Sequence, residues 1–242
     1  MQGLALWFSD FWHRHIYLNF IAEERWHYLT SGLINTLVIT FFALLLGTLL
    51  GAVVAVVRVT HDKAERPGLG VRVLNRICKV YLTVIRGTPV MVQLLIIYYA
   101  IFASVDINEV LVACLAFGIN SGAYVAEVFR SGIMSIDPGQ MEAGRSLGLP
   151  YSTVMLRVIM PQAIKNILPA LGNEFIALLK ETSVAGYIAI RDLTKGADII
   201  RSQTWDAFVP LLAAAAIYLA LVMLLEKGVH MLEGRLAQSD RG

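Results

Sequence analysis

Long apolar runs separated by short charged segments dominate the pattern of this chain. Four runs carry no charged side chain, and they contain 29, 19, 17 and 19 residues respectively: 29–57, 87–105, 110–126 and 207–225. Because about 20 apolar residues in a helix cross the hydrocarbon core of a bilayer, each run predicts a transmembrane helix.

A fifth apolar segment, residues 169–190, carries the charged residues Glu174, Lys180 and Glu181. We interpret it as a further transmembrane helix; an amphipathic helix on the membrane surface is the alternative. The pattern therefore predicts an all-α integral membrane protein with five transmembrane helices, in a membrane domain that covers residues 32–227.

The first 28 residues do not resemble a cleavable signal peptide, because no basic start precedes an apolar core. Their aromatic side chains instead favour an amphipathic helix at the headgroup level, outside the cytoplasm. At the other end, residues 228–242 are expected to form a cytoplasmic tail. The aromatic residues of the first segment are Trp7, Phe8, Phe11, Trp12, Tyr17, Phe20, Trp26 and Tyr28.

Basic residues are divided unevenly between the predicted loops. The short loop 106–109 has none, whereas six lie in residues 58–79 between the first two spans: Arg58, Lys63, Arg66, Arg72, Arg76 and Lys79. Since basic loops are retained in the cytoplasm, the distribution predicts an N-terminus outside and a C-terminus inside. An even number of spans, with the aromatic N-terminus inserted in the membrane, is the alternative.

The composition narrows the class of protein. With 57% hydrophobic and 16% charged residues, the chain lies outside the range of soluble domains. The net charge of +2 gives no indication of nucleic-acid binding. We expect no disulfide between Cys78 and Cys114, which fall in a basic loop and in a span, and no metal site, because the motifs of metal ligands are missing.

One polar segment, residues 137–161, interrupts the succession of spans and is predicted to lie in the cytoplasm. Asp137 is an N-cap candidate, Pro138 suits the first helical position and Gln140 completes a capping-box pattern. Gly148 is a plausible end for this short helix. A second helix is expected over 153–159, with a break at Pro161; an ordinary connector is the alternative for the whole segment.

The same segment resembles the EAA motif of ATP-binding-cassette importer permeases, in which EAA is followed after three residues by Gly and after nine more by Ile-x-Leu-Pro. Here the motif begins with Glu142, Ala143 and Gly144. Its later Gly, Ile, Leu and Pro positions are occupied by Gly148, Val158, Met160 and Pro161. Flanking blocks resemble the polar amino-acid uptake subfamily: 86–89 with Gln93, 120–124 with Glu127 and Arg130, and 179–183.

The resemblance implies a type-1 permease fold in a prokaryotic inner membrane, forming half of a translocation pathway for a polar amino acid. It implies that residues 137–161 form a coupling helix that docks on a cytoplasmic ATPase subunit, with Glu142 at the interface; a solvated helix charge is the alternative. The implied partners are ATPase subunits, a second permease copy or paralogue, and an extracytoplasmic binding protein. Because the chain has no GxxxxGK[ST] motif, ATP and Mg²⁺ are expected on the ATPase, and no cofactor on this chain.

Polar residues inside the predicted spans are candidates for lining the substrate pathway, because such groups are costly in a bilayer. A zwitterionic substrate needs an acceptor for its ammonium and donors for its carboxylate. Structural roles are the alternative. Glu127 and Arg130 would then form an ordinary i,i+3 pair, and Lys180 would bind a carboxylate of a neighbouring subunit. The cavity between the spans would be a passage without a specific substrate site. The candidates are Gln93, Asn120, Glu127, Lys180 and Glu181.

The ends of two spans carry further predictions. Gly87 and Pro89 predict a kinked entry into the second span. Residues 191–206 are expected to form an outer loop that contacts the binding protein or an outer gate, or a simple solvated loop. Two other functions stay open from the residues alone: an ion-coupled secondary transporter, for which no internal repeat is visible, and a membrane-anchored assembly subunit.

Overall fold

The computed structural model describes residues 9–64 and 66–238, and the ordered elements among them are all helical. Two predicted features extend beyond these ranges, because Trp7 and Phe8 of the aromatic segment and the last residues of the tail, 239–242, lie outside the described part. The elements are η1 (Trp12–Ile21), η2 (Ala22–Glu24), α2 (Trp26–Lys63), α3 (Leu69–Gly87), α4 (Val90–Ile96), η3 (Ile97–Ile101), α5 (Glu109–Met134), α6 (Pro138–Ser146), α7 (Tyr151–Val154), η4 (Met155–Ile159), α8 (Met160–Glu181), η5 (Thr182–Ile188), α9 (Leu193–Thr204) and α10 (Phe208–Gln238).

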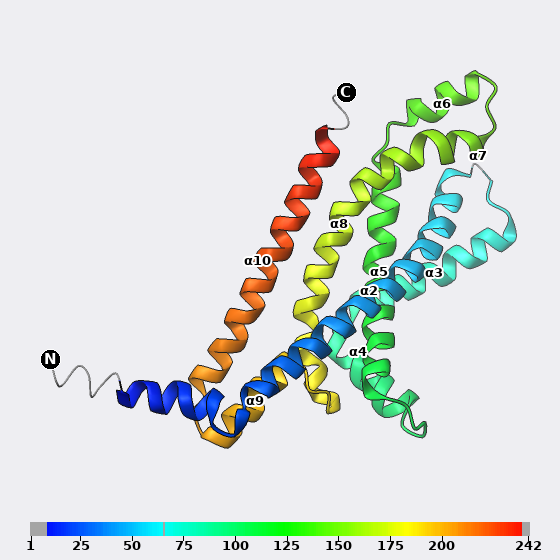
Figure 1. The fold of residues 1–242 in the computed structure, drawn as a ribbon. Helices are drawn as coiled ribbons and strands as arrows, with labels where there is room; N and C mark the ends of the chain where they lie inside the picture. Colours follow the sequence, from blue (N-terminus) through cyan, green and yellow to red (C-terminus); the bar gives the residue numbers. More distant parts are fainter. Residues whose placement is uncertain (1–8, 65, 239–242) are drawn as a thin grey trace.

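The long helices form an open bundle (Figure 1). α2 and α5 pack against each other at its centre, α8 contacts α5 and α2, and α10 packs on α8 and α9. The short helices α6 and α7 lie at the end where α5 finishes, whereas α9 and the N-terminal segment lie at the opposite end (Figure 1). The two ends of the bundle therefore carry different elements.

A stripe of small residues lets α2 and α5 approach closely. A Cβ on Gly47 would lie 2.9 Å from the side chain of Ser121, and one on Gly51 would lie 2.7 Å from Val125. Small residues at helix contacts are typical of membrane bundles, in which close packing replaces the hydrophobic effect. The opposite faces of these helices leave large apolar side chains exposed, among them Phe41, Leu49 and Val53.

Four helical stretches are long and apolar enough to cross a membrane, and a fifth crossing is possible if α3 and the helix after it count as one broken span. The all-α membrane fold is thus confirmed, and the assignment of the inner and outer ends stays a prediction. The predicted bounds of the second span, 87–105, are wrong. Its helix covers only Val90–Ile101, about 18 Å, and a bend of 108° at Thr88 and Pro89 joins it to α3.

Three other predicted boundaries also need correction. The basic segment expected as a loop between the first two spans is largely helical, in the end of α2 and in α3. The fourth long helix starts well before Pro169, which lies inside α8. Pro161 does not interrupt the helix. It lies in the first turn of α8, directly after the π-helical turn η4, where its missing N–H costs little.

The predicted outer loop 191–206 is instead helix α9 with short connections, and the predicted tail 228–242 continues α10 as far as Gln238. Asp192 begins α9: its carboxylate accepts from the backbone N–H of Lys195 at 2.7 Å and also from that of Gly186. The side chain is fully buried between η5 and α9, and this burial raises the pKa of Asp192. This buried cap, which binds backbone groups of both α9 and η5, explains why α9 forms where a loop was expected.

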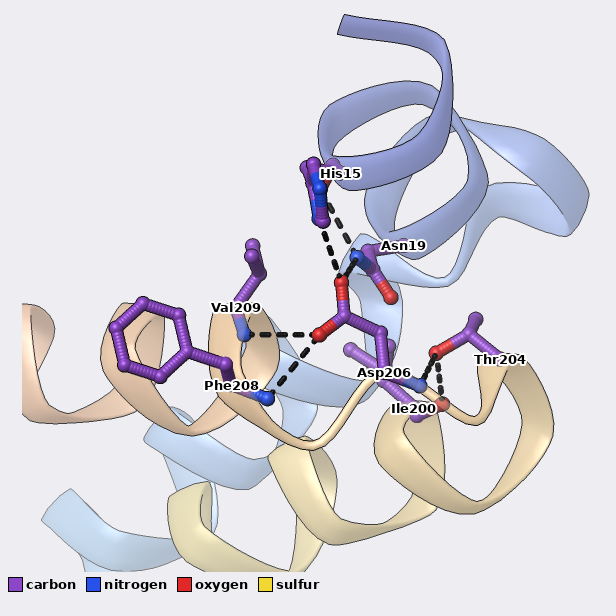
Figure 2. Close-up of polar contacts among 7 residues, drawn as sticks. All are labelled: His15, Asn19, Ile200, Thr204, Asp206, Phe208 and Val209. Carbon is purple, nitrogen blue, oxygen red and sulfur yellow. Dashed lines mark hydrogen bonds and ion pairs between the residues drawn. The ribbon is translucent and has the colours of Figure 1, made fainter. Parts of the chain in front are cut away.

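Asp206 joins the N-terminal segment to the start of α10 (Figure 2). One carboxylate oxygen, Oδ1, accepts from the backbone N–H groups of Phe208 and Val209 and so caps α10. The other, Oδ2, accepts from Asn19 Nδ2 at 2.8 Å and lies 3.0 Å from Nδ1 of His15. The segment expected at the headgroup level is therefore helical and is tied to the corner of the bundle where α10 begins.

Candidate functional site

The segment 137–161 forms two helices packed against each other. Asp137 accepts from the backbone N–H of Gly139 at 2.8 Å, as expected of the N-cap of α6. The helix ends at Gly148, whose φ of +81° places it in the left-handed region. The N–H of Gly148 bonds to Arg145 O and that of Leu149 to Gly144 O, which is a Schellman ending. Both predicted ends of this helix are confirmed; the second helix begins at Tyr151 rather than at 153.

Gly144 fixes how α6 sits on the rest of the chain. It is buried against Val154 of α7, and a Cβ at this position would lie 2.6 Å from Val154 Cγ2. The third Ala of the EAA motif is thus Gly here because α6 and α7 approach too closely for a methyl group. Glu142 and Ala143 are exposed on the other side of α6, and Leu147 beyond them is 82% exposed. Helices α6 and α7 therefore present a rigid surface on which Glu142, Ala143 and Leu147 are exposed.

Two of the predicted pathway residues, Gln93 and Asn120, contact each other. Asn120 Nδ2 donates to Gln93 Oε1 at 2.9 Å, and both side chains are buried. Gln93 Nε2 in turn donates to Ile85 O and to Thr88 Oγ1, each at 2.8 Å. These bonds satisfy carbonyl and hydroxyl groups at the bend between α3 and α4, so the two amides hold the broken helix against α5.

The structure also pairs two residues that the sequence did not connect. Ser121 Oγ of α5 donates to Glu174 Oε1 of α8 at 2.7 Å. In the sequence Glu174 is a charge inside a predicted span, and no local pattern places it against Ser121. Glu181 lies two turns further along α8 and is half-buried, whereas Lys180 is exposed. Polar groups of α5 and α8 therefore gather along the contact of these helices.

Glu127 lies apart from this group, near the end of α5. Its closest partner is Arg130, with Nε 3.1 Å from Glu127 Oε2, so the expected i,i+3 pair is present. Arg58 of α2 and Arg86 of α3 approach its other oxygen to 3.9 and 3.8 Å. The five candidate pathway residues thus divide into a buried amide pair, a charge cluster and two residues at the far end of α8.

Comparison with known proteins assigns the chain to a family. The family model of the binding-protein-dependent transport system inner membrane component matches residues 68–238. The chain belongs to this family. The resemblance to type I importer permeases drawn from the EAA spacing is therefore confirmed, and the chain is a permease subunit of the bacterial inner membrane rather than an enzyme.

Relatives of this permease carry different substrate names. The putative glutamine transport system permease protein GlnP of Rickettsia bellii is 35% identical over 88% of this chain and 94% of its own length. The L-cystine transport system permease protein TcyB of Bacillus subtilis is 34% identical over 89% of each chain. A crystal structure of an amino acid ABC transporter with histidines is 42% identical, with a TM-score of 0.79, over 89% of this chain and 98% of its own.

Proposed function

We propose that this permease is the membrane subunit of an ATP-driven importer of a polar amino acid, coupled to a separate ATPase through α6. The observation that carries the coupling is the geometry of α6: a helix fixed at both ends, packed through Gly144, with Glu142 and Ala143 free on its outer side. A rigid helix transmits the movement of a docked partner that a flexible loop would absorb.

The amino-acid substrate is inferred from relatives and from the chemistry of the bundle. Proteins named for glutamine and for L-cystine transport are about one-third identical to this chain. Their named substrates share a zwitterionic backbone, which needs an acceptor for the ammonium group and donors for the carboxylate. Glu174 and Glu181 supply the first kind of group and Lys180 the second, all on α8.

The permease would act in a pair, because one subunit offers only one side of a pathway. The polar side of α8 exposes Asn166, Asn173 and Lys180, although this helix belongs to a stretch long and apolar enough to span a membrane. Polar groups in such a stretch are costly against lipid. A second permease subunit facing α8 would place these groups in a shared pathway, open alternately to either side.

The test uses the permease reconstituted in vesicles with its ATPase and its extracytoplasmic binding protein. Glu142→Lys should reduce uptake and substrate-stimulated ATP hydrolysis by tenfold or more, while the subunit still inserts. Glu226→Lys is the matched control, because Glu226 is an exposed acid on α10 away from α6. Normal coupling in Glu142→Lys would contradict the role of α6. Uptake driven by an ion gradient without ATP would favour the secondary transporter instead.

A further inference from the structure

The helix α3 has two parallel stripes of exposed side chains. The first stripe is apolar and follows the spacing of one helix face, and each member is at least 51% exposed: Leu69, Val73, Ile77, Val80 and Val84. The second stripe is basic, lies about 100° round the helix and is also exposed: Arg72, Arg76, Lys79 and Arg86. A helix with adjacent apolar and basic stripes is typical of a membrane surface.

The basic stripe leads into a cavity of about 510 Å³ between α2, α3 and α5. Three basic groups and one acidic group line it: Arg58, Lys79, Arg86 and Glu127. The single carboxylate is already bound by Arg130, at 3.1 Å, and it lies 3.8 Å or more from Arg58 and Arg86. The cavity therefore has an excess of positive charge that the described residues do not neutralise.

One atom of Arg58 also lacks a partner for its positive group. Its side chain is only 14% exposed, and its Nε is buried without a hydrogen-bond partner among the described residues. A buried donor without a partner costs free energy. Lys79, on the opposite wall, has no ion pair within the part of the chain that the structure describes. These basic groups could together bind an anion that has several oxygen atoms.

An apolar groove of about 580 Å³ lies on another face of the same stretch of α3. Its walls are formed by Ile77, Val80 and Val84, with Tyr81 and Ile85 beside them. Glu127 lies 18 residues after the start of α5 at Glu109, hence about 27 Å along that helix. For a hydrocarbon core about 30 Å thick, this depth places the charged cavity next to a headgroup layer.

We propose that this cavity binds an anionic phospholipid, with its phosphate between Arg58, Lys79 and Arg86 and an acyl chain along the groove of Ile77, Val80 and Val84. Basic pockets between transmembrane helices are known to hold anionic headgroups. A soluble phosphate would use the cavity but gain nothing from the groove, and a zwitterionic lipid would leave the positive charge uncompensated. The lipid would fasten the bend at Thr88 and Pro89 to α2 and α5, because Arg86 belongs to the last turn of α3.

The experiment is native mass spectrometry of the full-length permease in a mild detergent. It is titrated with dioleoyl-phosphatidylglycerol, with dioleoyl-phosphatidylcholine, and with glycerol 3-phosphate as a soluble competitor. We expect phosphatidylglycerol to bind at least fivefold more tightly than phosphatidylcholine and to resist the competitor. Lys79→Gln and Arg86→Gln should each weaken its binding about fivefold. The matched control is Lys227→Gln, which removes an exposed charge on α10.

A second variant separates the groove from the charge. Val80→Asn should weaken binding of dioleoyl-phosphatidylglycerol while leaving binding of its short-chain dibutyryl form unchanged. Equal binding of the two dioleoyl lipids, or an unchanged affinity for phosphatidylglycerol in Lys79→Gln and Arg86→Gln, would overturn the proposal. Full displacement by glycerol 3-phosphate would also overturn it in favour of a soluble anion. None of these outcomes depends on the ATPase or on transport.

Discussion

Asn120 Nδ2 donates a hydrogen bond of 2.9 Å to Gln93 Oε1 and so connects α5 to the first turn of α4, directly after the bend. Gln93 uses its own donor group on Ile85 O and Thr88 Oγ1. A helix that breaks at a proline leaves backbone carbonyls without intrahelical partners, and in a membrane these must be satisfied by neighbouring groups. The amide pair performs this function where α3 and α4 separate.

Removing the amide of Gln93 should therefore destabilise the permease. Gln93→Ala leaves Asn120 without its acceptor and the bend without its donor, and we expect the free energy of unfolding to fall by about 1–3 kcal/mol. Thermal unfolding in detergent measures this. Gln162→Ala, which removes a single bond to Val158 O within one helix, is the control and should cost less. Unchanged unfolding together with altered substrate affinity would instead assign Gln93 to the pathway.

The close contact of α2 with α5 predicts a contrast between two glycines in transmembrane helices. A Cβ on Gly51 would lie 2.7 Å from Val125 Cγ1 and 2.8 Å from the backbone nitrogen of Ala126, whereas nothing lies within 4 Å of one on Gly228. Gly51→Ala should lower the free energy of unfolding by about 1–3 kcal/mol, because backbone atoms must move. Gly228→Ala should be neutral or stabilising by up to about 1 kcal/mol. The same loss in both variants would refute the packing argument.

The pair Gly144 and Val154 predicts a compensating double variant. Gly144→Ala should separate α6 from α7, since its methyl group meets Val154 Cγ2, and ATP hydrolysis should become less dependent on substrate. Val154→Ala removes the obstructing methyl groups. The double variant should recover part of the coupling and show an interaction energy of about 0.5–3 kcal/mol in thermal unfolding. Additive losses would mean that the two positions act independently.

Asp206 predicts how the N-terminal segment is retained. Asp206→Ala removes the cap of α10 and the acceptor of Asn19, so amide hydrogen exchange should become faster in η1 (Trp12–Ile21) and in the first turn of α10. Loss of the cap alone should cost about 1 kcal/mol. Asp198→Ala is the control, because this partly exposed acid contacts Lys195 and Arg201 but not η1. Unchanged exchange in η1 would contradict the tether.

The pH dependence of that tether follows from the same contacts. Burial acts to raise the pKa of Asp206, but the hydrogen bonds from His15, Asn19 and two backbone groups outweigh it and hold the pKa below the usual range of a carboxyl group. For an acid with a lowered pKa, the stabilisation is present above the unfolded value and is lost as the pH falls through the folded one. The carboxylate contacts of Asp206 should therefore persist at neutral and mildly acidic pH.

Patterns within short stretches were enough to predict much of this permease. The uncharged runs located the helices, because the thickness of the bilayer fixes the length of an apolar run. The caps of α6 were visible because Asp137 and Gly148 act on backbone groups within a few positions of themselves. The spacing of Glu142, Gly148 and Pro161 pointed to the family for the same reason: a short motif keeps its meaning without knowledge of distant residues.

Other features were decided only by the tertiary structure. The sequence predicts a loop where α9 forms, because the carboxylate of Asp192 is buried and also binds the N–H of Gly186, outside residues 191–206. Gly87 and Pro89 predicted a kink at the start of the second span, but not a bend as large as 108°. Ser121 meets Glu174 across 53 positions, and Glu127 meets arginines from three helices. Apolar periodicity determines which residues enter the membrane, whereas the partners of the polar residues depend on how the helices cross, and no local pattern encodes that crossing.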